Sequence, residues 1–405
     1  MKRLLHKKYV TAMMFLMFLF LYSIMNAQKE LPLLVDKIKT LAEDGATLKE
    51  SITGIETVIN ENVAGRYYFI DGYGYVQRIL DKNEENSFEV VKDTEGKLHY
   101  TYFTETTNKT SHLAKRTANL KESIKDKECK LVYVMPPDKY IKGHTTFATG
   151  LPYHMANETA DQFLNELEAE GVDYIDLRDY LPDSGLNMSE VFFKTDHHWT
   201  IETAFWATNT FFGQLQERYG EEIANEAYYE DLSNYNQVVY ENCFLGSMGR
   251  KSGRLYTEVD DFTLIYPKFP TSFRMESSIF GDMELTGRFE EALVATPVLR
   301  QAENPYDTDI YMTYMYGNQS YTCVENLENE DGLNICIIKD SFAVPFAAFS
   351  SLRCHNVYML DPRYYEEDME TFINAHEIDY VVVMFSPQDL VDEFFPFGAE
   401  DDEKN

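Results

Sequence analysis

The sequence contains few cysteines, and no two of them stand at a metal-ligand spacing. The five are an odd number, so at least one is unpaired; they are Cys129, Cys243, Cys323, Cys336 and Cys354. The absence of any Cys-x-x-Cys pair excludes the common cysteine-based zinc and dithiol motifs. Cys129 and Cys336 lie in apolar runs, where a free cysteine usually packs as a small hydrophobic residue.

Basic residues are also scarce. Lys and Arg number 36 against 68 Asp and Glu, which gives a formal net charge of −32. A surface this acidic repels the phosphates of nucleic acids and of anionic lipid headgroups. We therefore expect no nucleic-acid partner, and the acidity itself is typical of a charge that keeps a protein soluble.

One long uncharged run stands at the N-terminus. Four basic residues precede an apolar stretch from Tyr9 to Ala27, and residues 1–28 contain no acid. The stretch is close to the ~20 residues that span a bilayer, and the preceding positive charge predicts an N-terminus that stays inside. We expect residues 1–28 to be a signal anchor, with a signal peptide cleaved after Ala27 as the alternative. Either way, residues 29–405 are expected outside the cytoplasm, anchored to the cell membrane or secreted.

The next segment is predicted to be helical and then β. Apolar residues recur at helical spacing over 29–63, which indicates a helical stalk, and Asp44-Gly45 interrupts the pattern. Residues 67–76 contain an Asp-Gly pair between aromatic runs, which predicts a β-hairpin. A second strand pair is predicted over Ser87–Val91 and Lys97–Phe103.

From about residue 110 the pattern alternates between helices and apolar strands. The expected strands are 130–135, 172–177, 333–338, 356–360 and 378–385, and the expected helices are 110–126, 159–170, 201–218, 342–352 and 365–375. This alternation is typical of an α/β fold with a mostly parallel sheet covered on both faces, whose active site lies at the carboxyl ends of the strands. We expect this domain to cover 64–395, with an irregular or β-rich insertion at about 225–330 and an acidic tail at 396–405.

The first candidate for chemistry is Asp196-His197-His198-Trp199. An Asp two residues before a His can accept a hydrogen bond from the ring, which fixes the tautomer of a general base. Two other interpretations fit the same segment. Thr200 is well placed to cap a helix, and Asp196, His197 and His198 are all metal-ligand types, although no further cluster with ligand spacing follows.

The second candidate is Ser341. It follows the apolar run 333–338 and precedes an apparent helix in which Pro345 is tolerable only near the first turn. Ser341 would then lie at a strand-to-helix turn, where backbone N–H groups and the helix dipole stabilise an oxyanion. The alternative is that Ser341 is only a helix cap. Together the two segments supply a nucleophile, a base and an orienting acid.

These segments resemble the bacterial DHHW protein family and the SGNH-hydrolase-like domain of alginate O-acetylation proteins. Thr195 to Thr200 and Ile338 to Phe342 carry the resemblance, which covers roughly residues 64–390. Softer matches lie at 134–139, 245–250, 316–318 and 361–364.

The resemblance implies an SGNH-like three-layer α/β/α domain that esterifies or de-esterifies glycan hydroxyls. It makes Ser341 the nucleophile, His198 the base and Asp196 the residue that orients the base. His197 falls at a position that is not a catalytic histidine in the alginate relatives. The serine comes last in the chain, unlike in ordinary SGNH esterases, but a triad can be assembled from different chain orders.

Four further residues are candidates for substrate contacts. Asn318 and the backbone at Gly317 would help to hold an oxyanion. Trp199 would stack on a sugar ring, with packing in the core as its alternative. Arg363 would bind a glycan carboxylate, or else form a structural ion pair.

The expected function is an extracytoplasmic O-acyltransferase, acetyl by resemblance, which needs no cofactor or metal. With water as the acceptor the same site would be an O-acetyl esterase, and with a degenerate triad the protein would be a glycan-binding scaffold component of an envelope complex. A metal-dependent hydrolase is the third alternative. The implied partners are an acceptor glycan and a membrane-bound O-acyltransferase that supplies the acyl group.

Overall fold

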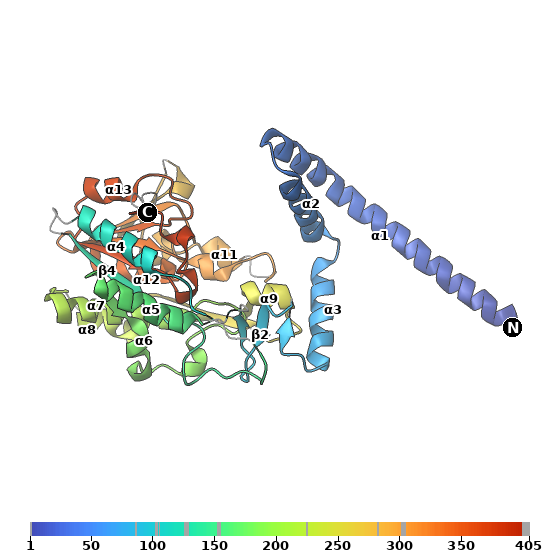
Figure 1. Cartoon of the computed structure of the whole chain (residues 1–405), viewed down its shortest axis with the longest axis horizontal. Coiled ribbons are helices and arrows are strands. Elements are labelled where there is room, and N and C mark those ends of the chain that lie inside the picture. The colour runs from blue at the N-terminus through green and yellow to red at the C-terminus, as the bar shows by residue number, and fades with distance from the viewer. Residues whose placement is uncertain are drawn as a thin grey trace. The chain divides into compact units, whose positions relative to one another are not determined.

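The computed structural model describes residues 2–85, 87–101, 104, 106–124, 129–151, 155–223, 226–281, 283–300 and 305–398 (Figure 1). By its internal contacts the chain separates into two units, Met1–Gln77 and Arg78–Asn405. The N-terminal unit is helical, and the second unit carries the sheets.

Two helices of the N-terminal unit, α1 (Lys2–Glu43) and α2 (Leu48–Asn62), form a helical hairpin. The side-chain oxygen of Asn26 in α1 accepts a hydrogen bond from the backbone N–H of Ala64, at the end of α2. Gly45 has a φ of +67° in the turn, and Thr47 caps α2 in a capping box. The break that the sequence predicts at Asp44-Gly45 is confirmed.

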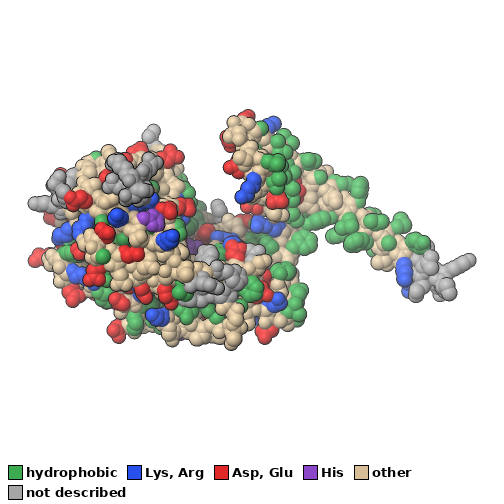
Figure 2. All heavy atoms as spheres, viewed as in Figure 1, with side chains coloured by type: hydrophobic (Ala, Val, Ile, Leu, Met, Phe, Trp, Pro, Cys, Tyr) green, Lys and Arg blue, Asp and Glu red, His purple; other side chains and the backbone are tan. Residues whose placement is uncertain are grey.

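Helix α1 is long and apolar enough to cross a membrane by length and composition. Its large hydrophobic side chains between Tyr9 and Met25, apart from the half-buried Tyr22, are exposed, and hydrophobic side chains are visible along the helix in Figure 2. This is the pattern expected of a membrane anchor or of a signal sequence.

The hairpin predicted over residues 67–76 is wrong. The segment is part of a helix, α3 (Arg66–Ile79), whose buried residues Asp71, Gly74 and Gln77 recur every third position. A two-stranded hairpin without further strands is only marginally stable. A helix satisfies its backbone hydrogen bonds within the segment and therefore needs no partner strand.

The predicted strand pair after residue 86 is confirmed in shorter form. β2 (Val90–Lys92) pairs antiparallel with β3 (Leu98–Tyr100), and β1 (Glu84–Glu85) adds a third strand. Residues 102 and 103 of the predicted second strand lie outside the described residues.

The main sheet has eight strands in the order β5-β4-β13-β11-β12-β10-β8-β9. The first five in this order are parallel, and the last three join antiparallel. The parallel strands are β5 (Asp173–Asp176), β4 (Lys130–Met135), β13 (Tyr380–Met384), β11 (Leu333–Lys339) and β12 (Cys354–Leu360). All five were predicted, and the mostly parallel sheet is confirmed.

Helices cover both faces of the sheet, which gives three layers. Alternate residues of one strand point to opposite faces, so that Tyr133 and Val134 of β4 belong to different hydrophobic cores. One core is closed by α4 (Ser111–Ser123), α5 (Ala156–Ala169) and α13 (Met369–Ala375), and the other by α7 (Ile201–Tyr219) and α12 (Ala343–Ser350). The α/β/α fold predicted from the sequence is therefore the observed one.

The insertion at about 225–330 is β-rich. It contains a hairpin of β6 (Tyr235–Phe244) and β7 (Asp260–Pro267), and between them the short helix α9 (Ser247–Ser252). Its remaining strands, β8 (Phe273–Ser277), β9 (Glu284–Gly287) and β10 (Tyr321–Asn326), extend the main sheet. The insertion is thus built into the same domain. Of the tail predicted at 396–405, residues 399–405 lie outside the described residues, whereas Phe397 is buried in a hydrophobic core.

Candidate active site

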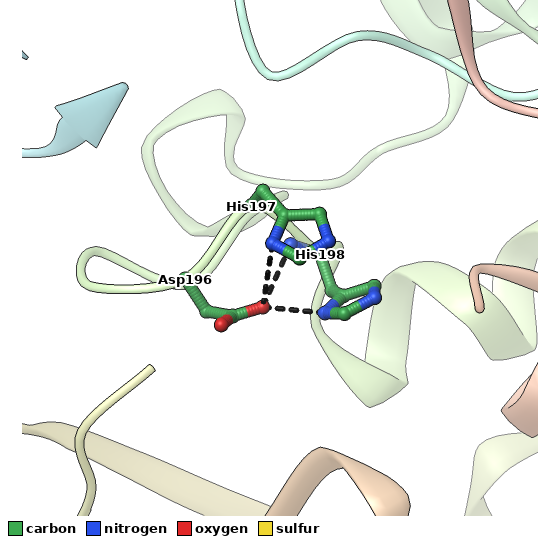
Figure 3. Close-up of side chains that lie close together, drawn as sticks. All are labelled: Asp196, His197 and His198. Atoms are coloured by element: carbon green, nitrogen blue, oxygen red, sulfur yellow. Dashed lines mark hydrogen bonds and ion pairs between the residues drawn. The ribbon is translucent and has the colours of Figure 1, made fainter. Parts of the chain in front are cut away.

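Three side chains form one chain of hydrogen bonds. The ring nitrogen Nδ1 of His198 lies 2.5 Å from Oδ1 of Asp196, and Nε2 lies 2.6 Å from Oγ of Ser341. Figure 3 shows the Asp196 carboxylate turned toward both neighbouring imidazoles. Asp196 and His198 are almost fully buried, and Ser341 is 7% exposed. The structure thus brings together the three residues that were predicted as acid, base and nucleophile.

Ser341 lies at the carboxyl end of β11, in the turn that leads into α12. Asp340 closes this turn: Oδ1 accepts the N–H of Phe342, and Oδ2 accepts the N–H of Ser386 beyond β13. The N-cap residue of α12 is Phe342, without a side-chain cap. Ser341 is therefore not a helix cap, and its hydroxyl faces His198 instead.

Asp196 and His198 lie in a tight loop before α7. The loop is closed by an isolated bridge between Phe192 and Trp199. Thr200 takes the N-cap position of α7, but its hydroxyl donates to the carbonyl of Glu190 instead of capping the helix. The capping alternative therefore does not account for this segment.

The Asp196 carboxylate is held in its ionised form. Burial acts to raise its pKa, but the imidazoles of His198 and His197, the hydrogen bond from His198 and the N–H of Ser247 outweigh burial. The pKa of Asp196 therefore lies well below its ordinary value. An ionised Asp196 can stabilise an imidazolium on His198 when that ring takes up a proton.

His197 is a neutral neighbour of the triad. Its Nδ1 lies 3.0 Å from the hydroxyl of Ser247, and its ring packs beside that of His198. Burial and the proximity of His198 lower the pKa of His197 to about 4. At neutral pH His197 therefore adds no charge beside the base.

Tyr311 supports the His198 ring and was not anticipated from the sequence. Its ring stacks on His198 with the centroids 3.8 Å apart and the planes 9° apart. Its hydroxyl accepts from the indole N–H of Trp199 at 3.1 Å and donates to the carbonyl of Phe342 at 3.3 Å. Tyr311 thus links the loop of the base to the turn of the nucleophile.

The insertion fixes the loop that carries Asp196. The carboxylate of Asp260 accepts the backbone N–H groups of Lys194 and Thr195 and the Thr195 hydroxyl. From the start of α9, the N–H of Gly246 donates to that hydroxyl, and the N–H of Ser247 donates to Asp196 at 2.6 Å. The motif 245–250 marks this contact in the sequence, whereas nothing local to Asp260 signals its role.

Lys139 holds the same loop from the end of β4. Its ammonium group donates to the carbonyls of Asp196 at 2.6 Å and Lys194 at 3.1 Å, and the side chain is buried. Burial lowers the pKa of Lys139 to about 7, against the attraction of Asp260 and Asp196. A neutral amine still has two N–H donors for the two carbonyls.

The low pKa of Lys139 predicts a pH-dependent stability. The ordinary lysine pKa is about 10.4, so between about pH 7 and 10 the unfolded chain binds more protons at this site than the folded chain. The contribution of Lys139 to the free energy of unfolding therefore rises with pH in this window. Urea unfolding should be measured at about pH 7 and about pH 9.5. The free energy of unfolding of wild type should exceed that of Lys139→Met by a larger amount at the higher pH.

Lys142→Met provides the matched control, because Lys142 is an exposed lysine of the same loop. Its difference from wild type should not change over this pH range. The prediction is contradicted if the free energies of unfolding of wild type and Lys139→Met differ by the same amount at both pH values.

Trp199 does not face a ligand. The side chain is wholly buried and packs edge-on against Phe342 at 5.4 Å between centroids. The expectation that it stacks on a sugar ring is wrong, because no face of the indole is open. Packing in the core, the alternative weighed from the sequence, describes it.

Asn318, Gly317 and Arg363 gather around a second charge cluster. The ammonium group of buried Lys339 donates to Asn318 at 2.7 Å and to Asp361 at 2.9 Å, and Arg363 also pairs with Asp361 at 2.7 Å. Gly317 has a φ of +82°. Among the described residues, no hydrogen bond joins Asn318 or Arg363 to the triad. Arg363 therefore has the structural ion pair that was its alternative role.

Asp196, His197 and His198 could in principle ligate a metal, since their ligand atoms lie within 4.8 Å of one another. The potential ligand atoms of Asp196 and His198 already take part in hydrogen bonds. Both ring nitrogens of His198 are engaged, by Asp196 and by Ser341, and both Asp196 oxygens accept hydrogen bonds. A metal would have to break the triad. Elemental analysis of the purified protein is therefore expected to find less than one metal ion per chain.

Two family models match parts of the chain. Residues 98–236 match the family model described as SGNH hydrolase-like domain, acetyltransferase AlgX, and residues 183–360 match the model of DHHW proteins. A sequence comparison with curated proteins gives no match.

The solved structures that share the fold include those of two proteins. PatB1 of Bacillus cereus is 21% identical with a TM-score of 0.60, over 76% of this chain and 99% of PatB1. Another structure of that protein carries a sulfonyl adduct. A DHHW family protein from Eubacterium siraeum DSM 15702 is 19% identical with a TM-score of 0.56, over 75% of this chain and 91% of its own. The two family matches and the shared fold thus confirm the resemblance drawn from the sequence: this chain is similar to DHHW proteins and has an SGNH-like domain.

Proposed function

We propose that the protein is an extracytoplasmic O-acetyltransferase that acts on hydroxyl groups of a glycan. The observation that carries the proposal is the buried hydrogen-bond chain from Asp196 through His198 to Ser341. The match of residues 98–236 to an acetyltransferase model supports the choice of reaction. The carboxyl edge of the parallel strands is also the usual place of an active site in this class of fold.

The first half of the reaction forms an acyl-enzyme. The Oγ of Ser341 attacks the carbonyl carbon of a donor ester while Nε2 of His198 takes the hydroxyl proton. The bond to the donor oxygen then breaks, and this oxygen leaves with the proton from His198. Asp196, ionised and bonded to Nδ1, stabilises the imidazolium in between.

The second half transfers the acyl group. A sugar hydroxyl attacks the ester carbonyl on Ser341, and His198 takes its proton and returns it to Oγ as the serine is released. With water in place of the sugar, the same steps make an esterase. The acceptor that reacts faster with the acyl-enzyme therefore decides between the two activities.

The oxyanion of each step needs donors. Among the residues that the structure describes, none accepts a hydrogen bond from the backbone N–H of Ser341. That N–H lies in the nucleophile turn and is therefore a suitable oxyanion donor. Asn318 holds Lys339 instead, so the donor role expected of its side chain would require that contact to be released.

The proposed location follows from α1, which fits a membrane span with the N-terminus inside. A catalytic unit outside the cytoplasm has no supply of acetyl-coenzyme A. We therefore propose that a membrane-bound O-acyltransferase delivers the acyl group, as the resemblance to alginate O-acetylation proteins implies.

The test is intact-mass analysis after incubation with 4-nitrophenyl acetate. We expect one acetyl group on Ser341 in the wild-type protein and none in His198→Ala. Adding sugar acceptors and following acetyl release to sugar or water then separates the transferase from the esterase. If Ser341 is never acetylated, under this or any other activated ester, the protein is a binding component without a working triad.

A further inference from the structure

Two neighbouring pockets share Asp138 as a lining residue, and the smaller of them is also lined by His197. The first, about 140 Å³, is lined by His197, Phe342, Lys139 and Asp138 among others; we call it the His197 pocket. The second, about 360 Å³, lies at the carboxyl ends of β4 and β5 and is lined by Asp138, Tyr140, Asn157 and Arg178 among others; we call it the Arg178 pocket. Because Asp138 lines both, the two pockets are neighbours.

Their sizes suit the two partners of an acyl transfer. The His197 pocket includes the residues next to His198 and Ser341 in the chain, and it has room for a small acyl group together with a water or two. The volume of the Arg178 pocket falls in the range of small-molecule sites, about 300–1,000 Å³. A sugar bound there would lie next to the His197 pocket, because Asp138 lines both.

The guanidinium of Arg178 is already fully engaged. It binds Asp176 at 2.7 and 2.9 Å, Asp161 at 2.8 Å and the carbonyl of Asn157 at 3.2 Å. Burial acts to lower the pKa of Arg178, but these carboxylates raise it. The guanidinium is therefore a fixed part of the pocket wall. It has no pair of N–H groups left for a bidentate contact with a ligand carboxylate.

The rest of the pocket is acidic. Asp138, Asp161, Asp176 and Asp179 line it against two cations, Arg178 and Lys142. Of these two, Lys142 alone has no carboxylate partner among the described residues, and its side chain is exposed. In the His197 pocket, the ammonium group of Lys139 already donates hydrogen bonds to two backbone carbonyls. A ligand carboxylate would therefore meet carboxylates without a positioned cation, which is unfavourable.

We infer that the Arg178 pocket is the acceptor subsite and that it selects uncharged sugars over uronic acids. This inference rests on the proposed function for its acyl-transfer step, but the binding preference stands on the pocket itself. Carboxylates such as Asp179 accept hydrogen bonds from sugar hydroxyls, and the ring of Tyr140, stacked on Phe147, supplies an apolar wall.

The experiment compares binding of uncharged oligosaccharides (oligomers of N-acetylglucosamine, of glucose and of mannose) with binding of an oligouronate of equal length. Titration calorimetry of the wild-type protein at one ionic strength should show an uncharged oligomer binding at least about tenfold more tightly than the oligouronate. Asp179→Lys, at an exposed position of the pocket, should reduce that ratio several-fold. Asp331→Lys is the matched control: Asp331 is exposed next to the amino end of β11, the opposite edge of the sheet, and its ratio should stay that of wild type.

Equal or tighter binding of the oligouronate, no binding of any uncharged oligomer, or a ratio unchanged in Asp179→Lys would each overturn the inference. Transfer from the acetylated enzyme to the same oligomers is the second readout and should follow the same order. If Ser341 cannot be acetylated, the proposed function fails while the binding comparison still decides the inference.

Discussion

Replacing Ser341 with alanine is expected to lower the rate of acetyl transfer at least about 10⁴-fold, because the nucleophile of a triad cannot be replaced by its neighbours. The side chain is small and lies in a turn that Asp340 holds independently through its own hydrogen bonds. The thermal midpoint should therefore change little. The measurement is the initial rate with 4-nitrophenyl acetate and a sugar acceptor, together with thermal unfolding of the same sample.

The control for this result is Ser278→Ala, an exposed serine at the end of β8. It should keep the wild-type rate. A Ser341→Ala protein that still acetylates a glycan at the wild-type rate would remove Ser341 from the mechanism. A rate loss that comes with a large fall in thermal midpoint would mean that the turn has been lost rather than the nucleophile.

Replacing Gly246 with alanine is expected to displace the acid of the triad. A Cβ at this position would lie 2.2 Å from Cβ of Asp196 and 2.5 Å from its Oδ2. The backbone φ of Gly246 is −69°, which any residue adopts, so the effect comes only from the overlap. Overpacking of this kind costs about 1–3 kcal/mol, and a shift of the catalytic loop by about 1 Å can cost roughly 10²-fold in rate.

Gly213→Ala is the matched control for Gly246→Ala. Gly213 lies within α7, and outside the adjacent backbone of that helix no atom of the described residues lies within 4 Å of a Cβ placed there. Alanine should raise helix stability by up to about 1 kcal/mol and leave the rate unchanged. Chemical unfolding and acetyl transfer should be measured for both variants, and equal behaviour of the two would show that the contact between Gly246 and Asp196 is not tight in solution.

The parallel half of the sheet could be predicted because its strands are buried on both faces. Runs such as 131–135 and 335–338 are apolar without interruption, and runs of this length between helices of regular period are typical of parallel strands. The same reasoning failed at 67–76. An Asp-Gly pair with aromatic flanks fits a hairpin locally, but the segment lies within helix α3, and a hairpin without further strands is only marginally stable.

The hydrogen-bond chain of Asp196, His198 and Ser341 could be predicted because these residues have distinct chemistry at short spacing or at a strand end. The residues that support them could not. Asp260 and Tyr311 are far from the triad in the chain, and they act through contacts that only the folded insertion creates. Trp199 was wrongly expected to face a sugar, although it is buried. The sequence alone does not distinguish an aromatic residue that packs in the core from one that contacts a ligand.

The place of β13 in the sheet sets an order of assembly. It is the last strand in the chain, yet it lies between β4 and β11, which are about 200 residues apart in the sequence. The residue after it, Ser386, also donates the N–H that fixes Asp340 beside the nucleophile. Contacts between such distant segments form late in folding. A chain emerging N-terminus first can therefore complete the turn around Ser341 only after Ser386 has been made, about 45 residues later.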